Sequence, residues 1–237
     1  MSRKIKRNLS ASVLARLLQR AREGGDDYQV LLSAFACERF LYRLSAGSSR
    51  DRFILKGAML LRVWSENPYR STRDLDLLRR GHGDADAICE DIAAICSSAV
   101  ESDGMEFDPS SRRHEAIRAE DEYGDRNSRI KDFFDLRYLA LRFPFERKVL
   151  VQAVRQTFSR RKTPVPAEPL GLTAAYWQNP SRPAQVSAFA RRAGLVVSPE
   201  EGAEILAVLR PFLLPVLADA RTERAGEDRW PPGGPWA

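Results

Sequence analysis

The sequence predicts an α/β half, of α+β character, that gives way near residue 126 to an all-helical half. Three observations carry this prediction. Residues 53–55 form a short apolar run, and residues 73–78 alternate in the way typical of a strand. The segments around these two stretches repeat their apolar residues at helical spacing. From Ser128 onward, every long segment has either a helical pattern or the composition of a loop.

Two helices are expected before the first strand. Residues 9–24 place leucines on one face, with Ser10 or Ser12 as the N-cap and a glycine pair as the stop. Residues 27–47 repeat this pattern with a broader apolar face. We expect the two helices to pack against each other.

The centre of the first half reads as a strand, a glycine turn, a helix and a returning strand. The turn is Gly57–Ala58, and MLLRVW after it has helical character. Pro68 keeps the following loop out of a helix. The pattern then predicts a helix over residues 83–104 and two short edge strands over residues 104–111 and 114–123.

Helices dominate the second half. Residues 128–143 and 145–161 are amphipathic, and Ser198 with Glu201 forms a capping box ahead of the last long helix. Two prolines should kink or split that helix. The expected division is an α/β domain over residues 1–126, a helical domain over residues 127–228 and a disordered tail over residues 229–237.

The composition excludes some classes of protein but does not identify the function. The formal net charge is +6 with a pI near 9.5, which suggests an anionic partner such as a nucleic acid or nucleotide. The alternative is arginine chosen simply for solvated faces. No apolar run approaches the ~18 residues of a membrane span, and no signal peptide is recognisable. We therefore expect a cytoplasmic location and no membrane partner. Three scattered cysteines and two histidines exclude a disulfide framework and a histidine-rich zinc site.

Asp74 and Asp76 are the strongest candidates for chemistry. Residues two apart in a strand are ~6.6 Å apart and share a face, so both carboxylates should project together opposite Leu75 and Leu77. Such a pair can hold divalent cations for phosphoryl transfer, and oxygen ligands suit Mg²⁺. The open alternative is two ordinary exposed acids, because a bare D-x-D has many false matches.

A phosphate site is expected next to this pair. The turn at Gly57 directs backbone N–H groups and a helix start toward the same region. The basic and hydroxyl side chains before the pair are candidates to hold phosphate oxygens, namely Arg70, Ser71, Thr72 and Arg73. Glycine turn, helix and D-x-D strand together indicate a nucleoside-triphosphate site.

These motifs carry a family resemblance. The stretch FILKGAMLLRVW…YRSTRDLDLL resembles the AbiEii/AbiGii nucleotidyltransferase toxins, which have K-G-(G/A)-x-x-L followed by R-(S/T)-T-x-D-(L/I)-D. SRIKDFFDLRYL is similar to that family's K-D-(F/I)-(Y/F)-D-L helix. The resemblance covers most of the chain.

The resemblance implies a polymerase-β-like nucleotidyltransferase core with N-terminal helices and a helical C-terminal domain. It implies the toxin of a bacterial toxin–antitoxin or phage-defence pair, with a cognate antitoxin. The implied reaction moves a nucleotide from an NTP to RNA, as MenT-like toxins do at the 3′ end of tRNA. By position, Asp74 and Asp76 would hold Mg²⁺. Nucleotide would contact Lys56, Gly57, Ala58, Arg70, Ser71 and Thr72, and the catalytic set would be completed by Lys131, Asp132 and Asp135. For these last three, a solvated helix face is the alternative.

The chain departs from the family pattern after residue 124. The family has a third strand ending in a carboxylate and then a helix with a Glu-Lys pair, and neither is found between Gly124 and Ser128. A block of about 50 residues, the scale of a strand, a helix and loops, would then be absent. Candidates to replace the lost acid are Asp108, Glu120, Asp121 and Glu122, and candidates to replace the lost lysine are Lys131 and Arg129.

Three functions therefore stay open. The first is an Mg²⁺-dependent nucleotidyltransferase acting on RNA. The second is a catalytically impaired remnant that binds nucleotide, RNA or antitoxin. The third is a DNA-binding regulator, which ranks last because no helix-turn-helix with a placed recognition helix is recognisable.

Overall fold

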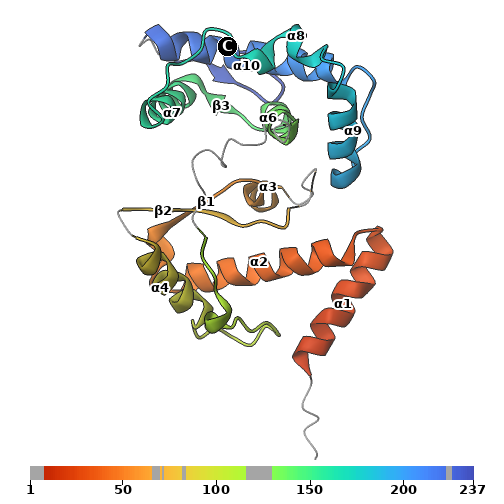
Figure 1. Ribbon diagram of the computed structural model, residues 1–237, viewed down its shortest axis with the longest axis vertical. Helices are drawn as coiled ribbons and strands as arrows, with labels where there is room; N and C mark the ends of the chain where they lie inside the picture. Colours follow the sequence, from red (N-terminus) through yellow and green to blue (C-terminus); the bar gives the residue numbers. More distant parts are fainter. Residues whose placement is uncertain (1–7, 66–69, 71, 82–83, 116–129, 223–225) are drawn as a thin grey trace, which may run out of the picture. The chain divides into compact units, whose positions relative to one another are not determined.

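A computed structural model of the protein describes residues 8–65, 70, 72–81, 84–115, 130–222 and 226–237. These residues divide between two compact units, Met1–Arg118 and Ala119–Ala237 (Figure 1). The boundary expected near residue 126 lies outside the described residues. Each unit is treated separately below.

The first unit combines helices with one small sheet. In chain order its described elements are α1 (Leu9–Gly24), α2 (Tyr28–Ala46), η1 (Arg50–Arg52), β1 (Phe53–Lys56), α3 (Met59–Trp64), β2 (Asp76–Arg79), α4 (Ala85–Cys96) and η2 (Pro109–Ser111). Strands β1 and β2 pair antiparallel, with Lys56 opposite Asp76. The expected strand–turn–helix–strand order is thus confirmed.

The two N-terminal helices begin and end at residues suited to those positions. Asn8 caps α1, because its side chain accepts a hydrogen bond from the Ala11 amide at 3.1 Å. The prediction of Ser10 or Ser12 as the cap is wrong, because both residues lie inside the helix. Gly25 ends α1 in the left-handed region, at φ 70°, where glycine carries no steric penalty.

The sheet has one covered face and one open face. Leu55 lies on the covered face and lines a hollow together with Leu41 and Leu44 of α2. Arg79, on the same face, donates a hydrogen bond to Asp91 of α4. Helices α2 and α4 therefore lie on this side (Figure 1). The opposite face carries the exposed side chains of Ile54, Lys56, Asp76 and Leu78.

Two sequence predictions fail after α4. The helix ends at Cys96 rather than continuing toward residue 104. Residues 105–108 form no strand, and a 3-10 turn follows them at Pro109–Ser111. The Met105 carbonyl instead accepts a hydrogen bond from Arg43 at 2.8 Å, so a helix side chain takes the place of a neighbouring strand. The second expected edge strand, residues 114–123, lies mostly outside the described residues.

The second unit is built around one long helix. Its described elements are α6 (Ile130–Arg142), β3 (Phe145–Glu146), α7 (Arg147–Arg160), η4 (Leu170–Leu172), α8 (Ala174–Trp177), α9 (Arg182–Ala193), α10 (Glu201–Thr222) and β4 (Arg229–Trp230). Helix α10 packs on α6 and α7, and Val151 of α7 lies in a buried cluster with Val216. Pro211 and Pro215 stand inside α10, which is one helix and not two.

The expected disordered tail is wrong. Trp230 is 2% exposed, and its indole N–H donates to the Ala140 carbonyl at 2.7 Å. Trp236 stacks on Phe212 with ring centroids 5.8 Å apart. Backbone hydrogen bonds of 2.8 and 3.0 Å join Arg229 and Ala237. The prolines and glycines give this segment the composition of a disordered end. Its two tryptophans nevertheless pack against residues of α6 and α10 and become part of their core.

Over the residues that the structure describes, the fold is α+β and mostly helical, with two separate two-stranded antiparallel sheets. Among the described helices, none combines the length and the apolar character that a bilayer span requires.

Candidate functional site

The junction of β1 and α3 is a tight glycine turn. Gly57 has φ 71°, in the left-handed region where a side chain would be strained. Its carbonyl accepts a hydrogen bond from the Leu60 amide at 3.1 Å, so α3 starts almost at once. Met59 and Leu61 are 1% and 3% exposed. Burial of these two side chains anchors the helix and thereby fixes the turn.

Asp76 lies directly against this turn. It begins β2 opposite Lys56, and a Cβ added at Gly57 would overlap the Asp76 carboxylate. Two independent features therefore require glycine at position 57: its backbone angle and the carboxylate above it. The two sequence motifs thus meet in the fold, because Lys56 and Gly57 of the first lie against Asp76 of the second.

Asp74 is fixed by a local turn. The Thr72 hydroxyl accepts a hydrogen bond from the Asp74 amide at 3.2 Å and lies 3.3 Å from its carbonyl oxygen. Thr72 is 8% exposed, so this turn is packed. The turn also explains why β2 starts at Asp76 and not at Arg73 as the alternation predicts. Exposure still alternates through this segment, with Asp74 and Asp76 exposed and Leu75 and Leu77 half-buried.

Helix α2 supports the same segment from behind. The Cys37 thiol donates to the Arg73 carbonyl at 3.9 Å. Burial raises the pKa of the Cys37 thiol, and the nearby negative charge of Asp74 raises it further. Arg73 itself pairs with Asp27, the N-cap of α2, at 3.6 Å. Helix α2 thus contacts the residue before Asp74 twice, through Cys37 in its middle and through its N-cap Asp27.

A buried carboxylate holds the far end of the sheet. Asp91 of α4 is 5% exposed; it accepts from Arg79 of β2 at 2.8 Å and also pairs with Arg52, just before β1. Hydrogen bonding from Arg79, followed by that from Arg52, lowers the pKa of Asp91 despite its burial. One acid therefore ties both strands to α4.

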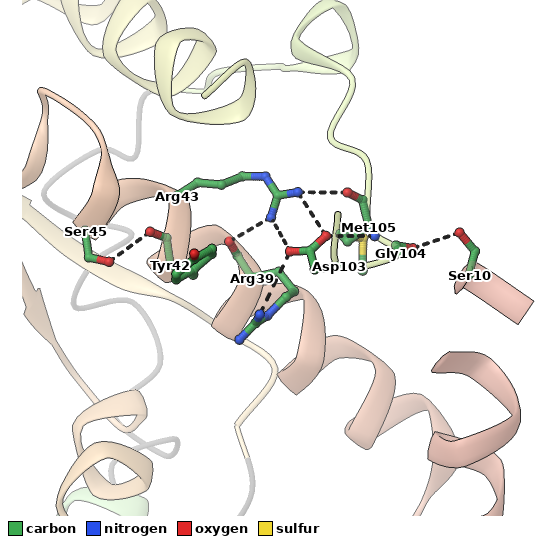
Figure 2. Close-up of polar contacts among 8 residues, drawn as sticks. All are labelled: Ser10, Arg39, Tyr42, Arg43, Ser45, Asp103, Gly104 and Met105. Carbon is green, nitrogen blue, oxygen red and sulfur yellow. Dashed lines mark hydrogen bonds and ion pairs between the residues drawn. The ribbon is translucent and has the colours of Figure 1, made fainter. Parts of the chain in front are cut away.

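A second ion-pair network closes the unit beside α1 (Figure 2). Arg43 of α2 grips Asp103 through two hydrogen bonds of 2.8 and 3.1 Å and also reaches the Met105 carbonyl. The Ser10 hydroxyl donates to the Gly104 carbonyl at 3.1 Å. Arg43 lowers the pKa of Asp103. This network is structural, because every charge in it is answered by another protein group.

The predicted nucleotide-binding residues fall into three groups. Lys56 and Gly57 are exposed beside Asp76, and Ala58 is half-buried. Thr72 contributes to the cluster by holding Asp74. Arg70 is half-buried and Ser71 lies outside the described residues.

The remaining predicted catalytic residues belong to the second unit. Lys131 and Asp132 are exposed on α6, and Asp135 is half-buried. Lys131 and Asp135, four apart, are neighbours on the helix surface. On the other side of α6, Phe133 packs on Trp177 with ring centroids 5.0 Å apart. Lys131 and Asp132 therefore lie at the surface while the phenylalanines anchor the helix, and the catalytic role of all three charged residues stays a prediction.

The donor set of the first unit suits part of a magnesium site. Its described ion pairs use four other acids, Asp27, Glu38, Asp91 and Asp103. Asp74 and Asp76 are not among these four, their side chains are exposed, and carboxylate oxygens are ligands that Mg²⁺ accepts. Among the described residues, no group of three histidine, cysteine or acidic side chains converges.

Asp108, proposed as a replacement acid, has a local structural role. It caps the 3-10 turn, accepting from the Ser110 amide at 2.8 Å and from its hydroxyl at 2.6 Å. The Ser110 hydroxyl lowers the pKa of Asp108. The other replacement acids and Arg129 lie outside the described residues.

Sequence reasoning missed the Arg52–Asp91–Arg79 network and Cys37. A signal for the first was present: Asp91 stands three residues after Ile88 and four before Ile95, on a helix face expected to be apolar. An acid on such a face needs a buried partner. Nothing comparable marks Cys37, whose role depends on where residue 73 passes.

Comparison with protein families gives one match. A family model described as "Nucleotidyl transferase AbiEii toxin, Type IV TA system" matches residues 39–125 and 114–207. The two matched stretches together span the glycine turn, both aspartates and the K-D helix. Comparisons with curated proteins and with solved structures give no significant match.

Proposed function

The chain belongs to the AbiEii family of nucleotidyltransferase toxins of type IV toxin–antitoxin systems, and on that premise we propose that it transfers a nucleotide from an NTP to an RNA acceptor such as the 3′ end of tRNA. The observation that supports this proposal is the Asp76 carboxylate, which lies against Gly57. Asp74, two residues earlier, donates its backbone amide to the Thr72 hydroxyl. A polymerase-β-like arrangement of the first unit is part of the same proposal. Such systems pair the toxin with an antitoxin.

The chain's own residues supply binding and positioning. Backbone amides at the Gly57 turn and the Lys56 ammonium would hold the departing phosphates. Asp74 and Asp76 would hold Mg²⁺, which when bound supplies the positive charge that a transferring phosphoryl group requires. Lys131, Asp132 and Asp135 of α6 are the remaining residues for which we propose a catalytic role. Because the Gly57 turn and the Thr72 bond fix the backbone near both carboxylates beforehand, we expect little backbone reorganisation during the reaction.

The test is transfer of labelled nucleotide. Each of the four NTPs, labelled at the α-phosphate, is incubated with the protein, Mg²⁺ and total tRNA, and labelled RNA is expected with at least one. Asp76→Asn should reduce transfer at least about 100-fold. Asp86→Asn, an exposed acid of α4, is the matched control and should leave the rate unchanged. Absence of label with every NTP would contradict the proposal.

A second candidate is the catalytically impaired remnant. Two observations favour it: no third carboxylate joins Asp74 and Asp76 among the described residues, and the family match comes as two stretches that meet at residues 114–125. A match split in this way is what loss of an internal tract would produce. This candidate requires NTP or RNA binding without transfer, and any growth defect caused by expression should be the same with Asp76→Asn.

A further inference from the structure

The open face of the β1–β2 sheet carries an apolar pair beside Asp76. Ile54 and Leu78 stand opposite each other in the register and are 39% and 42% exposed. They share a face with Lys56 and Asp76, the next pair with that orientation, at a spacing of ~6.6 Å along each strand. Single exposed apolar residues are normal. Ile54 and Leu78, however, lie directly opposite each other next to a predicted reaction site, so together they form a small apolar surface.

The order of groups along this face has a direction. Gly57 comes first, the Lys56–Asp76 pair second and the Ile54–Leu78 pair third. If the departing phosphates lie at Gly57, the α-phosphorus lies near Asp76. Attacking and leaving oxygens are roughly in line in phosphoryl transfer. The acceptor hydroxyl must then approach from the side away from Gly57, which is the side of Ile54 and Leu78.

We propose that Ile54 and Leu78 form a platform for the terminal nucleoside of the RNA acceptor, with its base lying against the two aliphatic side chains. This inference rests on the proposed function. Every base has a flat π face, whatever its identity. An apolar surface without hydrogen-bonding groups can therefore contact the terminal base without selecting a sequence. The acceptor hydroxyl oxygen then forms a bond to the α-phosphorus and gives its proton to water. The bond to the bridging oxygen breaks, and pyrophosphate leaves on the Gly57 side.

The first experiment truncates the platform. The double variant Ile54→Ala/Leu78→Ala should raise KM for the RNA about 10-fold, the scale expected when parts of two aliphatic side chains no longer contact the base, with KM for the NTP unchanged. The matched control is Leu14→Ala/Leu18→Ala on α1, whose side chains are 44% and 37% exposed, and it should change neither constant. Thermal unfolding checks that each variant is folded. Leu78→Met keeps the surface apolar and should raise KM for the RNA by much less than the double variant does.

The second experiment removes the base instead of the side chains. An acceptor RNA with an abasic 3′-terminal nucleotide should lose about the same factor with the unsubstituted protein. With the double variant it should lose nothing further, because both changes remove the same contact. Independent, multiplying losses would overturn the proposal. A rise in KM for the NTP alone would also overturn it, by assigning the platform to the NTP base.

The outcome for the platform can be separated from that for the proposed function. Equilibrium binding of intact and abasic RNA, followed by fluorescence anisotropy, requires no transfer. If no nucleotide is transferred but the double variant abolishes the preference for intact RNA, the proposed function fails and the platform stands. If transfer occurs and Asp76→Asn removes it, while the double variant binds both RNAs as the unsubstituted protein does, the platform is wrong.

Discussion

The two units differ in how much apolar packing accompanies their ion pairs. In the second unit the described core is aromatic and aliphatic, with Phe212 touching Phe145, Trp230 and Trp236 at ring-centroid distances of 5.2, 4.9 and 5.8 Å. In the first unit the described buried apolar residues are fewer and smaller on average: Val13, Ala21, Ala34, Leu44, Met59, Leu61 and Ile95. Arginine–carboxylate pairs link distant residues in both units, such as Arg43–Asp103 in the first and Arg147–Asp219 in the second. In the first unit they stand beside a smaller apolar core.

This difference separates a scaffold from a reaction site. Apolar burial supplies stability in proportion to area but has no direction. Ion pairs that are partly buried add little net stability, yet breaking one is costly and their geometry is specific. The unit that places Asp74 and Asp76 has less apolar burial beside its ion pairs, so we expect its stability to depend more on charge than that of the helical unit. Four substitutions test whether the contrast holds.

The largest effect is expected from Trp230→Ala. Removing a fully buried indole and its hydrogen bond to Ala140 should lower the free energy of unfolding of the second unit by about 3–5 kcal/mol. Hydrogen exchange of α6 and α10 should speed up, with α2 and α4 unaffected. Leu170→Ala, 69% exposed in the same unit, should change stability by less than about 0.5 kcal/mol. Equal destabilisation of both units would remove the contrast.

Gly57→Ala should have the next largest effect, on activity more than on stability. The added methyl group strains the left-handed backbone, at about 1 kcal/mol, and displaces the Asp76 carboxylate. A displaced catalytic group can cost about 100-fold in kcat/KM. Gly25→Ala is the matched control, because Gly25 has nearly the same φ, 70°, but nothing lies within 4 Å of the new methyl group. If both variants kept full activity, the close contact would have no catalytic role.

Asp91→Asn should destabilise the first unit by about 2 kcal/mol, because Arg79 loses a charged acceptor. The folded pKa values of Asp91 and Asp103 are lowered by their arginines. Their contribution to stability is therefore present above the unfolded value of about 4 and is lost as the pH falls through the folded pKa values.

Because both pKa values are lowered, the pH dependence of unfolding is a second way to test Asp91→Asn. Followed by hydrogen exchange, the first unit should open before the second as the pH falls below about 4. In Asp91→Asn that acid sensitivity should be reduced, because asparagine does not titrate. Acid opening that starts in the second unit would show that charge is not what distinguishes the two.

The smallest effect is expected from Thr72→Ala. Loss of the hydroxyl frees the Asp74 backbone at a cost of about 1 kcal/mol, which corresponds to about fivefold in transfer rate if the turn positions the carboxylate. Thr72→Ser keeps the hydroxyl and should restore activity. A fall in activity with Thr72→Ser as large as with Thr72→Ala would assign the effect to the lost methyl group.

Local patterns predicted much of the first unit. The apolar run at residues 53–55, the turn at Gly57 and the exposure of Asp74 and Asp76 follow from spacing between neighbours in the chain. The start of β2 did not, because Thr72 bonds the Asp74 backbone and competes with strand pairing. The contact between Gly57 and Asp76 also depends on register, which alternation alone does not fix.

Distant partners explain the errors. Residues 104–108 have the composition of a strand but lie beside Arg43, which takes the Met105 carbonyl. The segment from Arg229 to Ala237 looks disordered by composition, and only a core assembled from α6 and α10 gives Trp230 a place. Both outcomes are set by residues far away in the chain.

The buried Trp230 also bears on the order in which the chain acquires its structure. Its hydrogen bond to Ala140 joins residues 90 apart in sequence, whereas the Arg79–Asp91 link joins residues only 12 apart. Closing a long loop costs entropy before its contacts repay it, and distant pairings form slowly. The β4 segment should therefore dock late in folding, so that changes at Trp230 mainly accelerate unfolding and leave the folding rate nearly unchanged.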